Sequence, residues 1–155
     1  MFTTNSSTVN VRCLHRQVLT AHGRYANVSG MIVGTGIDIA EVHRIREAIE
    51  RHGQRFLNRV FTESEIQYCE SKANRVERYA ARFAAKEAGM KAIGTGWNHG
   101  VRWRDIEVSR KPGGRPTLLL HGKAAEFAGK LGATNIALSL THTTEQAMAQ
   151  VILES

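Results

Sequence analysis

Two carboxylates and one lysine have a spacing that suits metal-assisted chemistry on phosphates. Glu87 falls in the middle of the apolar face of a helical pattern, where a bare charge is costly and needs a shifted pKa, a charged partner or a metal ion. Asp38 follows a short apolar run at an expected strand-to-helix turn, and Lys91 lies one helical turn beyond Glu87 on nearly the same face. Carboxylate oxygens suit Mg²⁺, and the sequence contains no His-Glu-x-x-His or Cys-x-x-Cys pattern that would indicate zinc.

Other cationic side chains offer donors for phosphate oxygens. Arg82 and Lys86 belong to the helical pattern of Glu87, and His142 ends a later strand pattern. Plainer structural interpretations stay open for His142 and for Asp38. A lone histidine such as His142 in a Thr-rich strand end is more often structural than catalytic. Asp38 also begins a capping-box spacing that ends at Glu41, although a helix cap and a metal ligand do not exclude each other.

The element that must position Glu87 is a helix predicted over residues 75–93. Val76, Tyr79 and Phe83 share its apolar arc, whereas Arg75, Arg78 and Arg82 lie outside this arc, which predicts a solvated face. The glycine-rich segment that follows, residues 94–100, lacks the ending of a phosphate-binding loop. We expect it to be a flexible connection.

The remaining patterns predict an α+β single domain in which early helices pack on a mostly antiparallel sheet. A strand over residues 31–37 contains glycines, which indicates that another backbone approaches closely. A helix from Ile39 is expected to stop at Gly53, and a capping box over residues 62–65 opens a short helix. The later elements are strands over 103–110, 117–120, 135–142 and 146–153, with a turn over 111–116 and a helix over 123–131.

Composition is that of an ordinary soluble protein and narrows the class of partner. The chain has 155 residues, 42% hydrophobic and 23% charged. Cys13 and Cys69 form no disulfide framework, and no apolar run approaches the roughly 18 residues of a membrane helix or forms a secretion signal. We therefore expect a cytoplasmic protein with no membrane contact. The net charge of +7 indicates an anionic partner.

Residues 1–30 are rich in Ser, Thr and Asn, basic and without a period. They predict a flexible basic N-terminal extension, with the folded domain over residues 31–155. A transit peptide has little support in this segment. Because Met31 opens the first strongly patterned segment, it is also a plausible point for translation to begin.

Four short motifs together resemble one enzyme family, the holo-[acyl-carrier-protein] synthases, which are stand-alone 4′-phosphopantetheinyl transferases. The resemblance covers residues 31–153. Its motifs, in this order and spacing, are Gly36-Ile-Asp38-Ile, Arg82-Phe-Ala-Ala-Lys86-Glu87-Ala, Gly114-Arg-Pro116 and Ser139-Leu-Thr-His142-Thr.

The resemblance implies an activity, a fold and an assembly. It implies the 4′-phosphopantetheinyl transferase fold and a Mg²⁺-dependent enzyme that transfers 4′-phosphopantetheine from coenzyme A to a serine of apo acyl carrier protein. The second product would be adenosine 3′,5′-bisphosphate, and the reaction would support fatty acid biosynthesis. It also implies a homotrimer with coenzyme A bound in clefts between protomers.

The resemblance further implies roles for individual residues. Asp38 and Glu87 match the Mg²⁺ ligands, Glu87 and Lys91 are catalytic candidates, and Arg44 matches a position that docks the acidic carrier protein. Arg44 also fits a simple solvated helix face, since Arg46 and Glu47 are close to it. The coenzyme A-binding candidates are Arg82, Lys86, Lys91, Pro116, Ser139 and His142.

The mechanism and the rival functions stay open at this point. Glu87 could hold the metal, accept the serine proton, or do both. One rival is a non-enzymatic anion or nucleic-acid binding module, although the sequence lacks aromatic residues interleaved with basic ones, so we expect no nucleic-acid partner. The other rival is a Mg²⁺-dependent phosphoanhydride hydrolase, which would use the same carboxylates.

Overall fold

The computed structural model describes residues 17–19, 25–27, 30–110 and 114–155, which form two units, residues 1–30 and 31–155. The predicted turn over residues 111–116 therefore lies partly outside the described residues. The elements in chain order are β1 (Gln17–Leu19), β2 (Tyr25–Asn27), β3 (Ile32–Glu41), α1 (Val42–Val60), α2 (Glu63–Glu70), α3 (Arg75–Ala92), a 3₁₀ turn η1 (Trp103–Asp105), β4 (Ile106–Arg110), β5 (Pro116–Leu120), α4 (Gly122–Lys130), β6 (Asn135–His142) and β7 (Gln146–Glu154).

The first unit contains one short antiparallel ladder in its described part. Strand β1 pairs with β2, with Val18 opposite Ala26. The aperiodic sequence of residues 1–30 did not predict this pairing. The flexible character expected of the segment stays a prediction.

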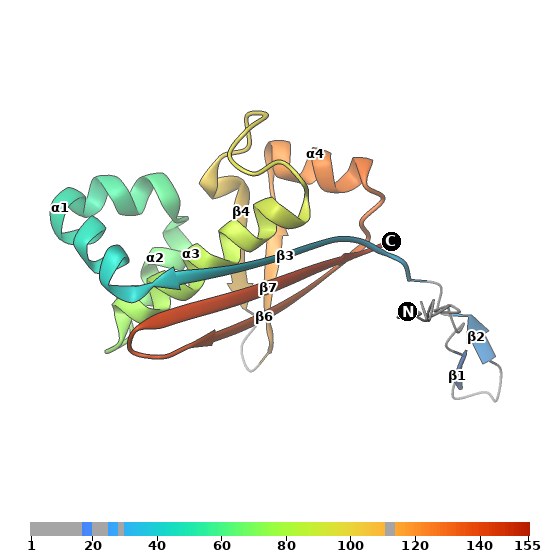
Figure 1. The fold of residues 1–155 in the computed structure, drawn as a ribbon, viewed down its shortest axis with the longest axis horizontal. Coiled ribbons are helices and arrows are strands. Elements are labelled where there is room, and N and C mark those ends of the chain that lie inside the picture. The colour runs from blue at the N-terminus through green and yellow to red at the C-terminus, as the bar shows by residue number, and fades with distance from the viewer. Residues whose placement is uncertain (1–16, 20–24, 28–29, 111–113) are drawn as a thin grey trace, which may run out of the picture. The chain divides into compact units, whose positions relative to one another are not determined.

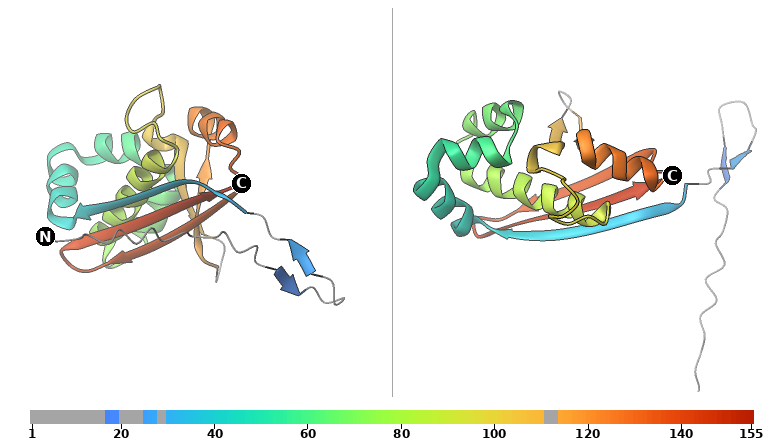
Figure 2. Two further views of the ribbon diagram at one scale, coloured as in Figure 1. Left: turned by 45° about the vertical axis from the view of Figure 1, so that its right-hand side comes forward. Right: turned by 90° about the horizontal axis from the view of Figure 1, so that it is seen from above.

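The second unit has the predicted α+β architecture. Its main sheet has the strand order β3-β7-β6, β4 and β5 form a separate two-stranded sheet, and all of these pairs are antiparallel. The helices lie on one side of the main sheet, and α3 runs along β3 and β7 (Figures 1 and 2). In the described part of the chain, no helix combines the length and apolar character that a membrane crossing requires.

Glycines on β3 allow α3 to approach the strand backbone directly. A Cβ at Gly34 would collide with the carbonyl oxygen of Ala92, and a Cβ at Gly36 would collide with that of Ala88. This close approach is the one that the glycines of the strand pattern predicted. As a result, the backbones of α3 and β3 lie almost in direct contact, and this contact sets the distance between the two elements.

Helix α3 is enclosed on almost every side. Tyr79, Ala84 and Ala88 are fully buried, as the apolar arc predicted. Arg82 is also buried, at 6% exposure, so the prediction that it lies on a solvated face is wrong. The predicted apolar arc described only part of the buried surface of α3, because α2 and β4 also pack against this helix.

Asp38 lies inside a strand, which corrects the expected capping box. Strand β3 continues through Glu41, with Asp38 opposite Ala149 of β7, so the ladder satisfies this backbone. Helix α1 starts at Val42, whose N–H donates to the carbonyl of Glu145 at 2.8 Å, and no side chain caps it. The strand ends later than predicted because its pairing with β7 continues to Gln146.

Two other local predictions had different outcomes. Gly53 does not end the first helix: it kinks α1 with a φ of 50°, and helical structure resumes up to Val60. The second capping box is confirmed, since the Glu65 N–H donates to Thr62 Oγ1 and the Thr62 N–H donates to a Glu65 carboxylate oxygen.

The face of the main sheet that points away from α3 exposes apolar side chains. Ile37 and Ile39 of β3 are 54% and 52% exposed, and Met148, which is opposite Ile39 on β7, is 38% exposed. The strand alternation explains this pattern, because Gly36, Asp38 and Ala40 face α3 and leave Ile37 and Ile39 on the outer face.

Candidate active site

The fold brings Asp38, Glu87 and Lys91 together where β3 runs against α3. Asp38 lies two residues beyond Gly36 on the same face of the strand, and Glu87 directly precedes Ala88, the residue that Gly36 meets. The Lys91 ammonium lies 2.8 Å from Asp38 Oδ1 and also donates to the Ile37 carbonyl at 3.0 Å. Close packing of helix on strand therefore assembles the predicted trio.

Negative charge accumulates around Glu87. Partial burial and the neighbouring Asp38 carboxylate raise the pKa of Glu87, while Lys91 and a hydrogen bond with the Trp97 side chain oppose this rise. Because Lys91 is already paired with Asp38, a second cation would favour the ionised form of Glu87.

The donor set fits a magnesium ion. In the described ranges, no group of three or more His, Cys, Asp or Glu side chains could hold a metal by itself. Asp38 and Glu87 would thus supply two carboxylates, and substrate phosphates and water would complete the coordination. Mg²⁺ usually binds proteins in this way.

The carboxylates open into a cleft of about 610 Å³ between β3, α1 and α3. Phe56 and Phe83 form part of its apolar wall, and Arg44 lies at its α1 side. The Arg44 side chain is 75% exposed and approaches Glu41 at 4.0 Å. The predicted partner-binding arginine is therefore accessible and lies beside the carboxylates.

A second hollow, of about 390 Å³, brings together three more of the predicted residues. Arg82, Pro116 and His142 line it, and it shares no lining residue with the carboxylate cleft. The Arg82 guanidinium lies 4.0 Å from the centre of the Tyr68 ring. Its buried Nε has no hydrogen-bond partner among the residues that the structure describes. A guanidinium with an unused donor at the wall of a hollow has the chemistry to bind an anion.

Sequence reasoning missed the other polar residues of this hollow. Arg78 and Arg110 add positive charge to its wall, beside Tyr68. Burial raises the pKa of Tyr68, but the three arginines Arg82, Arg78 and Arg110 outweigh burial and lower this pKa below its usual value. Arg78 lies one helical turn before Arg82 on α3, a spacing that the sequence does show. Tyr68 and Arg110 come from α2 and β4, and only tertiary packing brings them here, so the sequence pattern held no signal for these two.

Lys86 has a different role from the one predicted. It is fully buried, its ammonium lies 2.8 Å from the carboxylate of Glu65, and it also donates to the carbonyls of Trp103 and Ile106. Burial lowers the pKa of Lys86, while Glu65 counteracts this effect. With its three donors occupied inside the protein, Lys86 holds α3 to α2 and β4, and the prediction that it binds coenzyme A directly is corrected.

Ser139 lines neither of the two sites described above. It is an exposed position of β6, opposite Gln150 of β7, and it lines neither the carboxylate cleft nor the hollow of Arg82. Its coenzyme A contact stays a prediction.

The segment from Gly94 to Gly100 was expected to be only a connection. In the structure it holds Trp97 beside Glu87, and the Trp97 ring meets the Trp103 ring edge-on at 5.1 Å. Trp97 is therefore a further residue of the site, and its position depends on the turns at Gly94, Gly96 and Gly100, all at positive φ.

Sequence comparisons identify relatives of this chain. The family model described as the 4′-phosphopantetheinyl transferase superfamily matches residues 34–149. A holo-[acyl-carrier-protein] synthase from Solibacter usitatus is 66% identical over 125 residues, which cover 81% of this chain and 100% of the relative.

Solved structures show the same fold. The holo-[acyl-carrier-protein] synthase of Neisseria meningitidis superposes with a TM-score of 0.72 at 32% identity, covering 81% of this chain and 100% of the other. The synthase of Helicobacter pylori, solved in complex with coenzyme A, gives a TM-score of 0.67 at 31% identity and covers 77% of this chain and 98% of the other.

Proposed function

The chain belongs to the 4′-phosphopantetheinyl transferase superfamily and is an enzyme of the holo-[acyl-carrier-protein] synthase type, and from this premise we propose a reaction for its site. It transfers 4′-phosphopantetheine from coenzyme A to a serine of apo acyl carrier protein and releases adenosine 3′,5′-bisphosphate. Asp38 and Glu87 would hold the magnesium ion that this transfer requires. A role in cytoplasmic fatty acid synthesis follows from the acceptor and is part of the proposal.

The observation that carries the proposal is the grouping of Asp38, Glu87 and Lys91. The two carboxylates would hold Mg²⁺, which would supply positive charge to the pyrophosphate and its leaving oxygen. Lys91 extends from α3 to Asp38 and is half exposed, so it can also donate to a phosphate oxygen in the cleft. Fixed positive charge next to a transferring phosphoryl group stabilises the charge that develops there.

The serine proton needs an acceptor. In the proposed step the serine oxygen bonds to the phosphorus that carries pantetheine, and the bond from this phosphorus to the bridging oxygen breaks. We assign this proton to Glu87, whose carboxylate lies in the same cleft and can accept it directly or through a water molecule. Phe56 and Phe83, on the cleft wall, would keep water from this centre.

The two separate hollows support a site completed by a second chain. Coenzyme A carries a pyrophosphate and, at the other end of its nucleotide, a 3′-phosphate. We assign the pyrophosphate to the carboxylate cleft and the 3′-phosphate to the hollow of Arg82 and His142 on a neighbouring protomer. The exposed Ile37, Ile39 and Met148 give the sheet an apolar face for this contact, in the proposed homotrimer.

The location of Arg44 supports a docking role for α1. Its exposed guanidinium lies beside the carboxylates, where an acidic carrier protein must bring its serine. The net charge of +7 favours long-range attraction of such a partner. Arg44 would therefore affect the association rate more than the phosphoryl transfer itself.

Intact-mass measurement of an apo acyl carrier protein tests the proposal. A mass increase of one phosphopantetheine is expected with coenzyme A and Mg²⁺, and it should be lost with EDTA and in Glu87→Gln and Asp38→Asn. Glu126→Gln, an exposed carboxylate of α4, is the matched control and should keep the activity.

Two outcomes would favour the rival functions. Release of free phosphopantetheine without any acceptor would indicate a hydrolase. No mass increase on several carrier proteins, together with salt-dependent nucleic-acid binding by residues 31–155, would indicate a binding module. A particle mass other than three chains in light scattering would contradict the trimer alone.

A further inference from the structure

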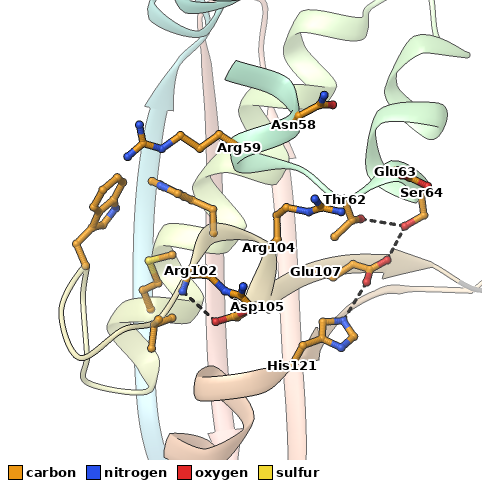
Figure 3. A pocket seen from close by; sticks show the side chains of 14 residues that line it. Asn58, Arg59, Thr62, Glu63, Ser64, Arg102, Arg104, Asp105, Glu107 and His121 are labelled. Atoms are coloured by element: carbon orange, nitrogen blue, oxygen red, sulfur yellow. Dashed lines mark hydrogen bonds and ion pairs between the residues drawn. The ribbon is translucent and has the colours of Figure 1, made fainter. Parts of the chain in front are cut away.

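The segment of residues 94–102, which connects α3 to η1, is fixed at both ends. At its start, two successive backbone N–H groups donate to the Met90 carbonyl at 3.2 and 3.3 Å. At its end, the backbone and guanidinium of Arg102 donate to the buried Asp105 carboxylate, in the wall of a cavity of about 1060 Å³ (Figure 3). A connection anchored in this way holds its middle residues in place.

The tip of the segment is also braced on a neighbouring helix. The His99 ring meets the ring of Phe127 in α4 edge-on, with 5.7 Å between their centres. The backbone of His99 has a φ of 65°, a left-handed conformation that is costly for a residue with a side chain. Such a conformation persists only where the surrounding contacts determine it. The course of the segment is therefore set by the fold around it.

Packing alone does not explain Trp97, which lies between these supports. Trp97 is 56% exposed, so much of the benefit of burying an indole ring is absent. Its ring meets the Trp103 ring edge-on at 5.1 Å, and its side chain forms a hydrogen bond with Glu87. The indole N–H is the one donor of a tryptophan side chain, so the Glu87 carboxylate is the acceptor.

Helix α3 carries the other end of this arrangement. Phe83, one helical turn before Glu87, stacks at 4.7 Å on Trp103, and Trp103 in turn supports Trp97. Because Trp97 then bonds to Glu87, these contacts form a closed circuit that begins and ends on α3. A closed circuit of contacts restricts the indole more than any one of them would.

The hydrogen bond leaves Glu87 able to bind a metal ion. A carboxylate has two oxygens with about four acceptor sites, and the indole uses one of these sites. Lys91 is already engaged with Asp38 and with the Ile37 carbonyl. Carboxylates that bind metals are usually hydrogen-bonded to a neighbouring group, which sets the orientation of the ligand. Trp97 is such a neighbour of Glu87.

We propose that Trp97 is a positioning residue for Glu87: its indole N–H restricts the torsions of the Glu87 side chain and thereby strengthens divalent-cation binding by the carboxylate pair. The inference rests on the proposed function, in which Asp38 and Glu87 hold Mg²⁺. Trp97 acts through Glu87 and takes no part in the transfer itself. Loss of the N–H should therefore weaken metal binding far more than it slows the metal-loaded enzyme.

Metal affinity tests the proposal directly. Mn²⁺, which suits the same oxygen ligands as Mg²⁺, is titrated into the full-length enzyme with coenzyme A and without carrier protein, and the EPR signal of free Mn²⁺ is recorded. Trp97→Phe keeps an aromatic ring but has no N–H. Its dissociation constant for Mn²⁺ should be about 10–100-fold higher than that of the unaltered enzyme. This constant is independent of how much enzyme is folded.

The second tryptophan provides the matched control. Trp103→Phe keeps the indole of Trp97, and its dissociation constant for Mn²⁺ should stay close to that of the unaltered enzyme. In this variant Trp97 is the single tryptophan of the chain, so it can be replaced by benzothienylalanine, which has sulfur in place of the N–H. This exchange should raise the dissociation constant by the same about 10–100-fold.

Initial rates of carrier-protein modification separate positioning from a structural defect. In Trp97→Phe, the Mg²⁺ concentration that gives half the maximal rate should rise by about 10–100-fold, and the rate at saturating Mg²⁺ should fall much less. A merely structural role would lower the rate at every Mg²⁺ concentration and leave the half-maximal concentration unchanged.

Three results would overturn the inference and leave the proposed function intact. These are equal Mn²⁺ affinity of Trp97→Phe and the unaltered enzyme, an equal loss in Trp97→Phe and Trp103→Phe, and no loss on exchange of the N–H for sulfur. The proposed function itself would fail if the unaltered enzyme bound no Mn²⁺ and modified the carrier protein equally well in EDTA.

Discussion

The Lys91 ammonium of α3 lies 2.8 Å from a carboxylate oxygen of Asp38 in β3. The pair joins the helix to the strand at the point where the substrate phosphates would bind. Lys91 thus neutralises one carboxylate and places a positive charge at the cleft, beside the Glu87 carboxylate.

Replacement of this lysine should impair chemistry more than folding. We expect Lys91→Met to lower kcat/KM for carrier-protein modification by about 10²–10³-fold, because a charge aimed at the transferring group is lost. Initial rates at saturating Mg²⁺ measure the effect. Lys123→Met removes a similarly exposed lysine that pairs with Glu126 on α4, and its rate should match that of the unaltered enzyme. Equal rates for both variants would contradict the role given to Lys91.

Replacement of Lys86 should impair folding more than substrate binding. Lys86→Met leaves the buried Glu65 carboxylate without its partner and should lower the free energy of unfolding by about 3–5 kcal/mol. Urea titration measures this loss, and the exposed control Lys123→Met should cost less than about 1 kcal/mol. The KM for coenzyme A should stay unchanged in the folded fraction of Lys86→Met, and a clear rise there would restore Lys86 as a phosphate-binding residue.

Arg82 should distinguish coenzyme A from its analogue without the 3′-phosphate. We expect Arg82→Leu to raise the KM for coenzyme A by about 10–100-fold, the usual effect of losing a hydrogen bond to a charged group. The KM for dephospho-coenzyme A should change little, because it has no phosphate at this position. Thermal unfolding of the same variant gives the structural control. Equal increases for both substrates would place the 3′-phosphate elsewhere.

Cys69 should be inert in the folded protein. Burial raises the pKa of its thiol to about 12, so almost no reactive thiolate is present at pH 8. In a Cys13→Ser background, a thiol reagent should label no cysteine under native conditions and Cys69 after unfolding in guanidinium. Rapid native labelling would show that α2 opens or that the thiol is accessible.

Local patterns predicted the helix of Glu87 and the last two strands closely. Helix α3 and strands β6 and β7 have long regular periods, and their observed ends lie within one residue of the predicted ones. Strand β3 was predicted too short, because residues 38–41 satisfy both a cap and a strand. Pairing with β7, which is distant in sequence, decides between these alternatives.

The site was predictable where chemistry and helical spacing coincide. Glu87 and Lys91 share one face of a helix, and Asp38 lies near it through the glycine contact. Lys86 was misassigned because its role depends on Glu65, which the sequence presents as a helix cap and the structure shows as a buried ion-pair partner as well. Trp97 was overlooked because a glycine-rich segment carries no period that would fix a side chain.

The contact of Gly34 and Gly36 with the backbone of α3 also bears on how the enzyme meets its substrates. Because main chain rests on main chain, folding fixes the distance between the backbones that carry Asp38 and Glu87. The part of preorganisation that concerns the backbone is therefore complete before metal or coenzyme A arrives, and only side-chain torsions are left to be ordered on binding.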